Sequence, residues 1–417
     1  MTNASTYHLA TALRSVAILA LVAGCSSITD PVQQSSAALT SLPRALSAGE
    51  QKLVSATNDF SFNLFRQLSA AQKDTNIFTS PLSASFALGM TMNGAANATL
   101  DQMRTTLGFG SAAESDVNES YKSLIALLRG LDNTVDVRIA NGIWYRNGYS
   151  VKQPFLDAGR MYFDAQIASI DFGSPTAPKT VNDWVSTATA GKIPTIVSSL
   201  SDLDMILVNA IYFKGSWRQR FDPAETTNEQ FHGVAGDQPM RLMYHKGPVA
   251  FTSNANFSAV DLPYGDSAFT MTVVVPSNGV SIDAVATTLM QGNAWRTMLD
   301  QMHRANVDLF IPKLKIEWER TLNSDLITLG MRDAFSDATA DFSRLASQAA
   351  MIGFVKQKTY VDINEEGTEA AAVTAVGITT VSAPANPQFR ADHPFIFVIR
   401  ERLTGTIMFM GRIVRMP

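Results

Sequence analysis

The sequence of 417 residues contains a single cysteine, Cys25, and few charged residues. One cysteine excludes disulfide bonds within the chain, so stability has to come from packing rather than from covalent cross-links. Charged residues make up 17% and hydrophobic residues 46% of the chain. That composition is unlike a disordered protein and is sufficient for a sizeable core.

Basic residues form no patch or tract, and the formal net charge is −4. A nucleic-acid-binding surface needs clustered Lys and Arg, so we expect no nucleic-acid partner. No stretch after residue 30 is long and apolar enough to span a bilayer. The sequence also shows no internal repeat and no sign of a second domain.

Catalytic signatures are missing as well. The sequence has no Gly-x-Ser-x-Gly elbow, no Walker loop and no dinucleotide fingerprint. Its five histidines show no metal-ligand spacing: His8, His232, His245, His303 and His393. We therefore expect neither an enzyme nor a metal or cofactor site.

The first 25 residues have the pattern of an export signal. Arg14 is positively charged, and residues 16–23 form an apolar run of the length of an h-region. Val22-Ala23-Gly24-Cys25 resembles a bacterial lipobox, in which cleavage leaves the cysteine as a lipid-bearing N-terminus. This resemblance implies a signal peptide over residues 1–24 and membrane attachment through lipidated Cys25. An ordinary secretory signal with an incidental thiol is the alternative.

Ser26, rather than Asp, follows the cysteine, which favours sorting to an outer membrane. We expect an exported protein that is lipid-anchored at the bacterial cell envelope, at the outer membrane or cell surface, or else extracellular. Residues 25–50 are rich in Ser and Ala and predict a flexible tether. One folded domain then covers residues 51–417.

The remaining sequence mixes helix and strand patterns. Apolar residues at helical spacing cover residues 53–68. Ser80 and Pro81 suit the N-cap and first position of a second helix, and residues 88–103 continue as helix. Residues 135–145 and 205–213 have the pattern of strands, the second one buried on both faces.

The stretch from 365 to 382 is ambiguous, because its alanines favour helix and its β-branched residues favour strand. No proline interrupts it, so every residue keeps the N–H group that a central strand needs. Small residues at alternate positions would share one face of an extended chain: Thr368, Ala370, Ala372 and Thr374. The pattern is typical of a mobile loop that later becomes a buried strand. An Ala-rich surface helix or a solvated connector is the alternative.

The run Phe-Arg-Ala-Asp-His-Pro-Phe-Ile-Phe-Val-Ile, which starts at Phe389, resembles the signature of the serpin family. Glu-Glu-Gly-Thr-Glu-Ala-Ala-Ala, which starts at Glu365, resembles the reactive-loop hinge of inhibitory serpins. Further landmarks follow in serpin order: Phe310-Ile311-Pro312-Lys313, Leu329-Gly330-Met331, Asp333-Ala334-Phe335 and Ala340-Asp341-Phe342-Ser343. The resemblance covers residues 53–417. It implies an α+β serpin fold with a large, mostly antiparallel central sheet, two further sheets, eight or nine helices and an exposed reactive loop.

The resemblance also implies roles for particular residues. The loop hinge comprises Glu365, Gly367, Thr368, Glu369, Ala370, Ala371 and Ala372. The shutter, where the central sheet opens, comprises Ser80, Ser83, Asn182 and Gln357, the last in place of the histidine of many serpins. Trp217 matches the breach, the site at which the loop first enters the sheet.

Family spacing from Gly367 places the reactive bond at Val381–Ser382, with Thr380–Val381 as a neighbouring alternative. A valine after a threonine suits the shallow apolar pocket of elastase-like or subtilisin-like proteases. No basic residue lies between Glu365 and Gln388, which argues against trypsin-like targets.

The resemblance thus implies a monomeric suicide inhibitor. A target serine protease would cut the reactive loop and form a covalent acyl complex, and the cut loop would insert into the central sheet. The alternatives are a non-inhibitory serpin with a chaperone, carrier or structural role, and a cross-class inhibitor of cysteine proteases.

Overall fold

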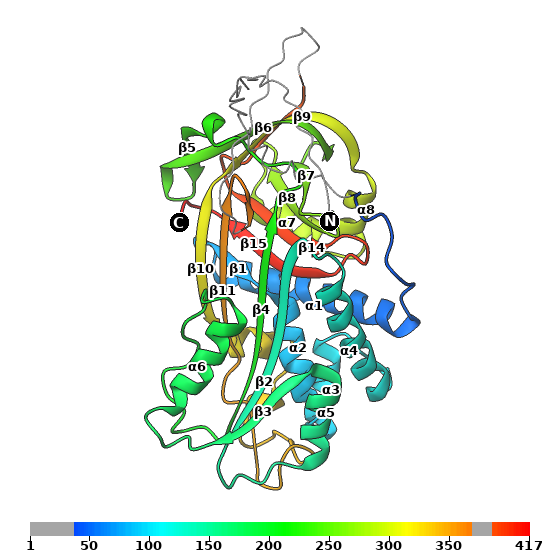
Figure 1. The fold of residues 1–417 in the computed structure, drawn as a ribbon, viewed down its shortest axis with the longest axis vertical. Helices are drawn as coiled ribbons and strands as arrows, with labels where there is room; N and C mark the ends of the chain where they lie inside the picture. The colour runs from blue at the N-terminus through cyan, green and yellow to red at the C-terminus, as the bar shows by residue number, and fades with distance from the viewer. Residues whose placement is uncertain (1–36, 369–385) are drawn as a thin grey trace, which may run out of the picture. The chain divides into compact units, whose positions relative to one another are not determined.

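The computed structural model describes residues 37–368 and 386–417, which form two β-sheets with helices packed against them (Figure 1). The helices are α1 (Ala48–Ala71), α2 (Pro81–Met92), α3 (Asn97–Thr106), α4 (Glu114–Gly130), α5 (Gln153–Phe163), α6 (Ala177–Ala188), α7 (Ile282–Leu289), α8 (Ala294–Asp300) and α9 (Asn323–Thr328), with short 3₁₀ turns η1 (Pro223–Glu225) and η2 (Asp333–Phe335). This combination confirms the expected α+β class.

The strands are β1 (Ile77–Thr79), β2 (Val135–Arg146), β3 (Ala165–Ile170), β4 (Met205–Ser216), β5 (Thr227–Gly233), β6 (Gly236–Ser253), β7 (Phe257–Pro263), β8 (Phe269–Pro276), β9 (His303–Pro312), β10 (Leu314–Thr321), β11 (Lys356–Asn364), β12 (Gly367–Thr368), β13 (Gln388–Arg390), β14 (Phe395–Glu401) and β15 (Ile407–Ile413). The predicted strands at residues 135–145 and 205–213 correspond to β2 and β4.

The six-stranded sheet is the expected central sheet, with the strand order β10-β11-β12-β4-β2-β3. Its neighbours pair antiparallel except β2 and β3, which are parallel. β4 is apolar on both faces because both are covered. Ile206 and Val208 belong to the core beneath α6, and Ile211 and Phe213 belong to the main core. In Figure 1, α6 lies in front of this sheet and α2 lies behind it.

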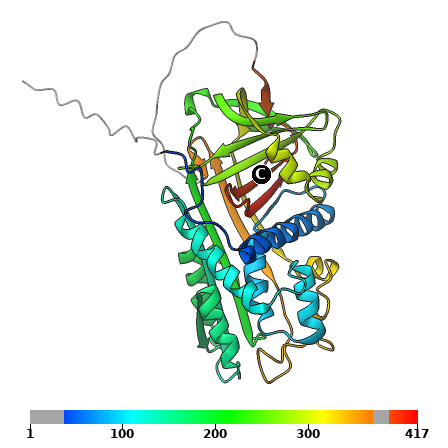
Figure 2. The same ribbon diagram turned by 90° about the vertical axis from the view of Figure 1, so that its right-hand side faces the viewer.

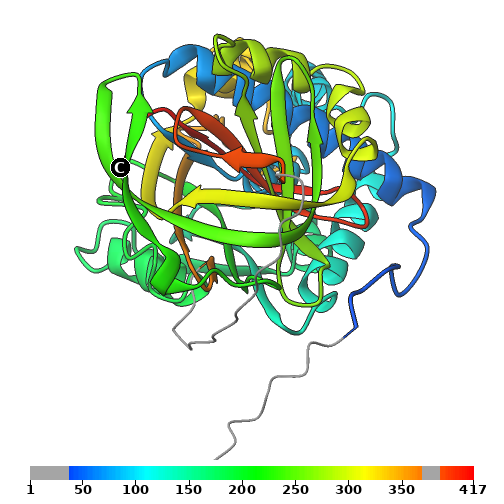
Figure 3. The ribbon, with the colours of Figure 1, turned by 90° about the horizontal axis from the view of Figure 1, so that it is seen from above.

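The other sheet has nine strands in the order β1-β15-β14-β8-β7-β6-β9-β13, with β5 paired to β6. We expected two further sheets; in the described residues β6 pairs with strands of both and joins them into one continuous sheet. β6 is 18 residues long and pairs in turn with β5, β9 and β7. Figure 3 shows β6 and β9 running side by side across this end of the molecule.

The helix expected to continue over residues 88–103 is broken. α2 ends at Met92 and α3 begins at Asn97. The Ala96 N–H donates to the Asp341 carbonyl at 2.9 Å. A Cβ at Gly94 would lie 2.6 Å from the Cβ of Leu345. The break is therefore stabilised by contacts with residues about 250 positions away, which a local helix pattern does not contain.

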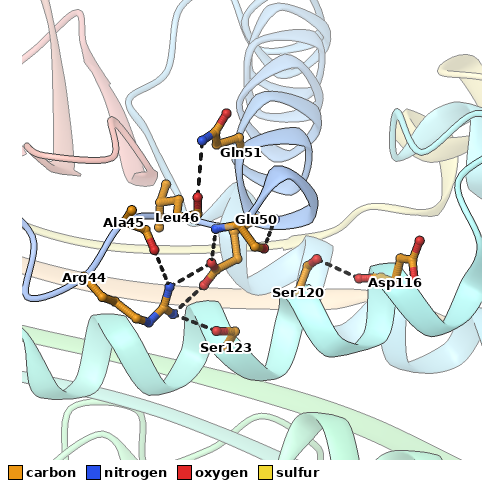
Figure 4. Close-up of polar contacts among 9 residues, drawn as sticks. Arg44, Ala45, Leu46, Glu50, Gln51, Asp116, Ser120 and Ser123 are labelled. Atoms are coloured by element: carbon orange, nitrogen blue, oxygen red, sulfur yellow. Dashed lines mark hydrogen bonds and ion pairs between the residues drawn. The ribbon is translucent and has the colours of Figure 1, made fainter.

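The folded unit begins at Ala37, ahead of the boundary at residue 51 that we expected. Ser47 and Glu50 form a capping box at the start of α1. Arg44 donates to a carboxylate oxygen of Glu50 at 2.8 Å and to the Ser123 hydroxyl of α4 at 2.7 Å (Figure 4). The last part of the expected tether is thus fixed on the domain. Figure 2 shows α1 next to β14 and β15.

Across residues 37–368 and 386–417, every helix is too short or too polar to cross a bilayer.

Candidate functional site

A gap between two strands defines the candidate site. β4 and β11 lie on either side of β12, which is only two residues long. Thr368 pairs with Gly215 of β4 and with Ile363 of β11, and Gly367 pairs with Ser216 and Asn364. Among the described residues, β4 and β11 have no direct pairing below β12. Both strands therefore present a long row of backbone groups toward the gap.

The top of the gap holds the hinge, and Gly367 fits there because it lacks a side chain. A Cβ at Gly367 would lie 2.1 Å from the Gly215 carbonyl oxygen, closer than any real Cβ contact. Thr368 beside it is 3% exposed. Two hinge residues that we expected in the exposed loop are thus already part of the sheet.

The turn before Gly367 is held by the chain that follows β4. The Trp217 N–H donates to the Glu366 carbonyl at 2.7 Å, and the Phe221 N–H donates to the Glu365 carbonyl at 2.9 Å. The Trp217 indole N–H donates to the Asn364 carbonyl at 2.8 Å. Trp217, the predicted breach residue, therefore contacts the turn that leads into β12.

Ion pairs hold the two buried glutamates of the same turn. Lys313 Nζ lies 2.7 Å from Glu365, whose other oxygen accepts from the Thr226 hydroxyl at 2.9 Å. Arg220 lies 3.6 Å from Glu366. Burial opposes ionisation of Glu365, but the bonds from Lys313, its own backbone and Thr226 outweigh it and lower the pKa of this carboxyl. The hinge is thus tied to Lys313, which lies between β9 and β10, and to the segment after β4.

Ser80 and Gln357, two of the predicted shutter residues, are in contact with each other. The Gln357 amide donates to the Ser80 carbonyl at 2.7 Å, and its oxygen accepts from the Ser80 N–H at 3.0 Å. The same oxygen accepts from the Thr79 hydroxyl at 2.5 Å. A glutamine thus joins β11 to the start of α2 by donating and accepting at once. Ser83 lies nearby, and its hydroxyl donates to the Asn209 carbonyl at 3.4 Å.

The expected position of the shutter asparagine is wrong. Asn182 lies on α6, where its amide donates to the Val197 carbonyl at 2.8 Å and its oxygen accepts from the Ile196 N–H at 2.8 Å. It fixes the segment after α6 rather than joining Gln357. Asn209 of β4 lines the same cavity as Ser83 and Gln357. Asn209 is a polar residue inside the apolar run at 205–213, and this feature of the sequence could have indicated its position beside Ser83 and Gln357.

Two cavities lie along the gap below the hinge. A narrow cavity of 20 Å³ lies beneath Thr368, and a larger one of 410 Å³ lies at the lower end of the gap. The larger cavity is lined by α2, by the first residues of β4 and by the chain leading into β11. Both cavities therefore lie along the line that β12 begins, next to backbone groups of β4 and β11 that no described strand pairs.

Several predicted residues lie outside the described part of the chain. They are Cys25 of the lipobox, Glu369, Ala370, Ala371 and Ala372 of the hinge, and Thr380, Val381 and Ser382 around the reactive bond. In residues 37–368 and 386–417, no group of three or more His, Cys, Asp and Glu side chains is arranged to hold a metal ion.

Sequence reasoning missed Lys313, Arg220, Thr226 and Tyr264. Lys313 ends the motif Phe310-Ile311-Pro312-Lys313, so the motif identified the residue, but nothing in the sequence identified Glu365 as its partner. Tyr264 follows a short strand, and nothing local connects it with residue 368. Their roles come from contacts between segments that are distant in the sequence.

The family described as Serpin (serine protease inhibitor) matches residues 55–416 of the chain. The chain therefore belongs to the serpin family, whose members are mostly protease inhibitors rather than enzymes.

Two relatives show the range of similar proteins. The leukocyte elastase inhibitor of Homo sapiens is 34% identical over 87% of this chain and 99% of its own length. An uncharacterized serpin-like protein of Thermococcus kodakarensis is 33% identical over 88% of this chain and 87% of its own length.

Solved structures agree with the fold. Native tengpin, a thermophilic serpin, has a TM-score of 0.80 at 30% identity and covers 89% of this chain and 96% of its own. Human thyroxine-binding globulin with its hormone has a TM-score of 0.80 at 28% identity and covers 88% of this chain and 99% of its own.

Proposed function

We propose that the chain is a suicide-type inhibitor of serine endopeptidases, with elastase-like or subtilisin-like enzymes as targets. The observation that carries this proposal is the gap between β4 and β11, of which β12 fills only the upper end. An unfilled strand position leaves two rows of backbone donors and acceptors that an added strand can satisfy. The reactive loop continues directly from β12 and is the segment placed to supply that strand.

In the proposed mechanism a protease serine attacks the carbonyl carbon of Val381, and the Val381–Ser382 bond breaks to leave an acyl-enzyme. The loop on the N-terminal side of the cut then enters the sheet below Thr368 and carries the protease with it. Ala370, Ala371 and Ala372 suit this step because small side chains enter a packed sheet at little cost. Distortion of the protease before water attacks the acyl bond completes inhibition.

The relatives support the elastase class of target. The human and Xenopus laevis relatives are both named leukocyte elastase inhibitor, and each is 34% identical to this chain. For this chain the corresponding evidence is the valine and threonine at the proposed reactive bond and the absence of basic residues around it.

Incubation with pancreatic-type elastase tests the proposal. We expect a complex that survives a denaturing gel and a released C-terminal peptide that begins at Ser382 by mass spectrometry. Elastase with its catalytic serine replaced by alanine is the matched control, because it binds the loop but forms no acyl bond. Clean cleavage without a complex, for a panel of elastase-like and subtilisin-like enzymes, contradicts inhibition and favours a non-inhibitory serpin. Trapping of cysteine proteases alone favours the cross-class alternative.

We also propose that the chain is exported as a monomer and anchored through a lipid on Cys25 at the bacterial cell envelope. The support is the apolar run at residues 16–23 followed by Val-Ala-Gly-Cys. Two acyl chains on one cysteine suffice for stable membrane attachment. Cys25→Ser is expected to move the protein from the membrane fraction to the soluble fraction. Unchanged membrane association of this variant contradicts the anchor.

A further inference from the structure

Tyr264 lies beside the hinge but belongs to neither strand of the gap. It directly follows β7 and is 0% exposed. Its hydroxyl and the Thr368 hydroxyl share a hydrogen bond of 2.7 Å, which joins residues 104 positions apart. This is a contact between the nine-stranded sheet and the residue at the upper end of the gap.

The ring of Tyr264 has little freedom to move. It stacks on Trp217 with ring centres 4.5 Å apart and planes 17° apart, and it meets Phe213 edge-on at 4.9 Å. It also lies against Gly215, where a Cβ would come within 2.9 Å of the ring. Gly215 is the residue of β4 that pairs with Thr368. The ring therefore fills the space that a side chain on β4 would otherwise occupy, and its hydroxyl reaches across to the hinge.

The turn that carries Tyr264 is fixed from three sides. The Gly265 N–H donates to the Ser216 carbonyl at 2.9 Å, and the Arg218 guanidinium donates to the Gly265 carbonyl at 2.9 Å. The Asp266 N–H donates to the Asp132 carboxylate at 3.0 Å. The Leu39 N–H, from the N-terminal end of the folded unit, donates to the Asp266 carbonyl at 2.7 Å. These hydrogen bonds fix the position of Tyr264 relative to the hinge.

The Tyr264 hydroxyl carries its proton at neutral pH. Burial raises the pKa of this phenol, and the bond to Thr368 opposes the rise only in part. Two neutral hydroxyls in a buried site depend on each other, because loss of one leaves the other unpaired.

We propose that Tyr264 is a positioning residue for loop insertion: it holds Thr368 at the entrance of the gap, so that the cut loop inserts from a hinge that is already paired with β4 and β11. This inference rests on the proposed inhibitory function, because insertion is the step that it serves. Its structural part, the hold on Thr368, is measurable without any protease.

The test uses four substitutions in the full chain. Tyr264→Phe keeps the ring stack on Trp217 and removes the hydroxyl. Thr368→Val keeps the shape and removes the partner oxygen, whereas Thr368→Ser keeps that oxygen. Tyr244→Phe is the matched control, since the Tyr244 hydroxyl donates to Asp308 at 3.1 Å, away from the hinge.

The first readout is hydrogen–deuterium exchange in peptides that cover Glu365–Thr368. One lost buried hydrogen bond corresponds to about a tenfold change in a local opening equilibrium. We expect about tenfold faster exchange in Tyr264→Phe and in Thr368→Val, no further increase when the two are combined, and native exchange in Thr368→Ser and Tyr244→Phe. Exchange in Tyr264→Phe equal to that in Tyr244→Phe overturns the proposal, and so does an additive double variant.

The second readout is the number of inhibitor molecules consumed per trapped protease. If insertion starts from the paired hinge, a tenfold smaller paired population raises this number by up to about tenfold in Tyr264→Phe. Faster exchange with an unchanged number, in a chain that does inhibit, overturns the positioning role. If the native chain traps no protease, the proposed function fails while the exchange experiment still decides whether Tyr264 holds the hinge.

Discussion

At the scale of single residues, a few buried charges fix the ends of elements. Glu50 is the clearest case, because it caps α1 and binds Arg44. Its hydrogen bonds from Arg44 hold the pKa of this carboxyl at about 2, against the opposing effect of burial, and Ser123 and the Ser47 backbone contribute in the same direction.

This pKa predicts an acid-sensitive contribution to stability. The pKa of Glu50 is lower in the folded than in the unfolded chain, so its contribution is complete above the ordinary value of 4.5 and is lost as the pH falls toward about 2. We expect Glu50→Gln to lower the free energy of unfolding by about 1–2 kcal/mol at pH 7, and by less at pH 3.

Urea unfolding at both pH values checks this prediction. Glu114→Gln is the control, because the Glu114–Arg344 pair is more exposed and is expected to contribute about 0–1 kcal/mol. An equal loss in both variants, or a loss for Glu50→Gln that is the same at pH 3 and pH 7, would contradict the role given to Glu50.

His393 predicts the opposite dependence on pH. One ring nitrogen faces Asp392 at 2.9 Å and the other faces the Pro276 carbonyl at 3.0 Å, so only the charged ring donates to both. The bond to Asp392 raises the pKa of His393, although burial lowers it. The resulting stability is complete below the ordinary value of 6.5 and is lost as the pH rises through the folded value.

We therefore expect the free energy of unfolding to fall between pH 6 and pH 8.5 in the native chain, and to fall less in His393→Gln. His232→Gln, which removes an exposed histidine, is the control. Parallel pH profiles for the native chain and His393→Gln would show that this histidine does not link the start of β14 to β8.

At the scale of elements, the two residues of β12 decide how the sheet is filled. Thr368 is buried between Gly215 and Ile363, so a large charged side chain has no room there. We expect Thr368→Arg to turn the inhibitor into a substrate, because burying an unpaired guanidinium costs on the order of several kcal/mol. Denaturing gels with elastase check this, with Thr368→Ser as the conservative control that keeps the hydroxyl. Complex formation by the Arg variant at the native ratio would mean that inhibition does not require Thr368 to stay buried between β4 and β11.

The elements that were predictable are those whose pattern is local. The apolar run at 205–213 is β4, and Ser80 caps α2 with Pro81 in its first turn. The break between α2 and α3, the joining of two sheets by β6 and the position of Asn209 all depend on distant partners. A single sequence does not display those partners, so these features appeared only in the structure.

The candidate site was predictable only where a local motif marks its residues. The family motifs identified the hinge, Trp217, Ser80 and Gln357, and the structure brings these residues to the gap between β4 and β11. The motifs gave no partner for Glu365 or Thr368. Lys313 and Tyr264 were found through their contacts, at 2.7 Å in both cases.

At the scale of the whole molecule, the described residues fill the strand position between β4 and β11 only at its upper end. Cavities of 20 and 410 Å³ lie along the gap, where a further strand would pair with β4 and β11. A close-packed interior with such space is less stable than one in which it is filled. We infer that the native state is kinetically stable: conversion to the state with an inserted strand is slow, although that state has the lower free energy.

The most direct test of this account is the stability of the chain after its reactive loop has been cut. A protease that cuts at Val381–Ser382 without being trapped would give the cleaved form, and thermal and guanidinium unfolding would then compare it with the intact chain. The account predicts that the cleaved chain is far more stable, with its unfolding midpoint raised by tens of degrees as in other hyperstable folds. An unchanged or lower midpoint would mean that the loop does not enter the gap between β4 and β11, and would contradict inhibition by insertion.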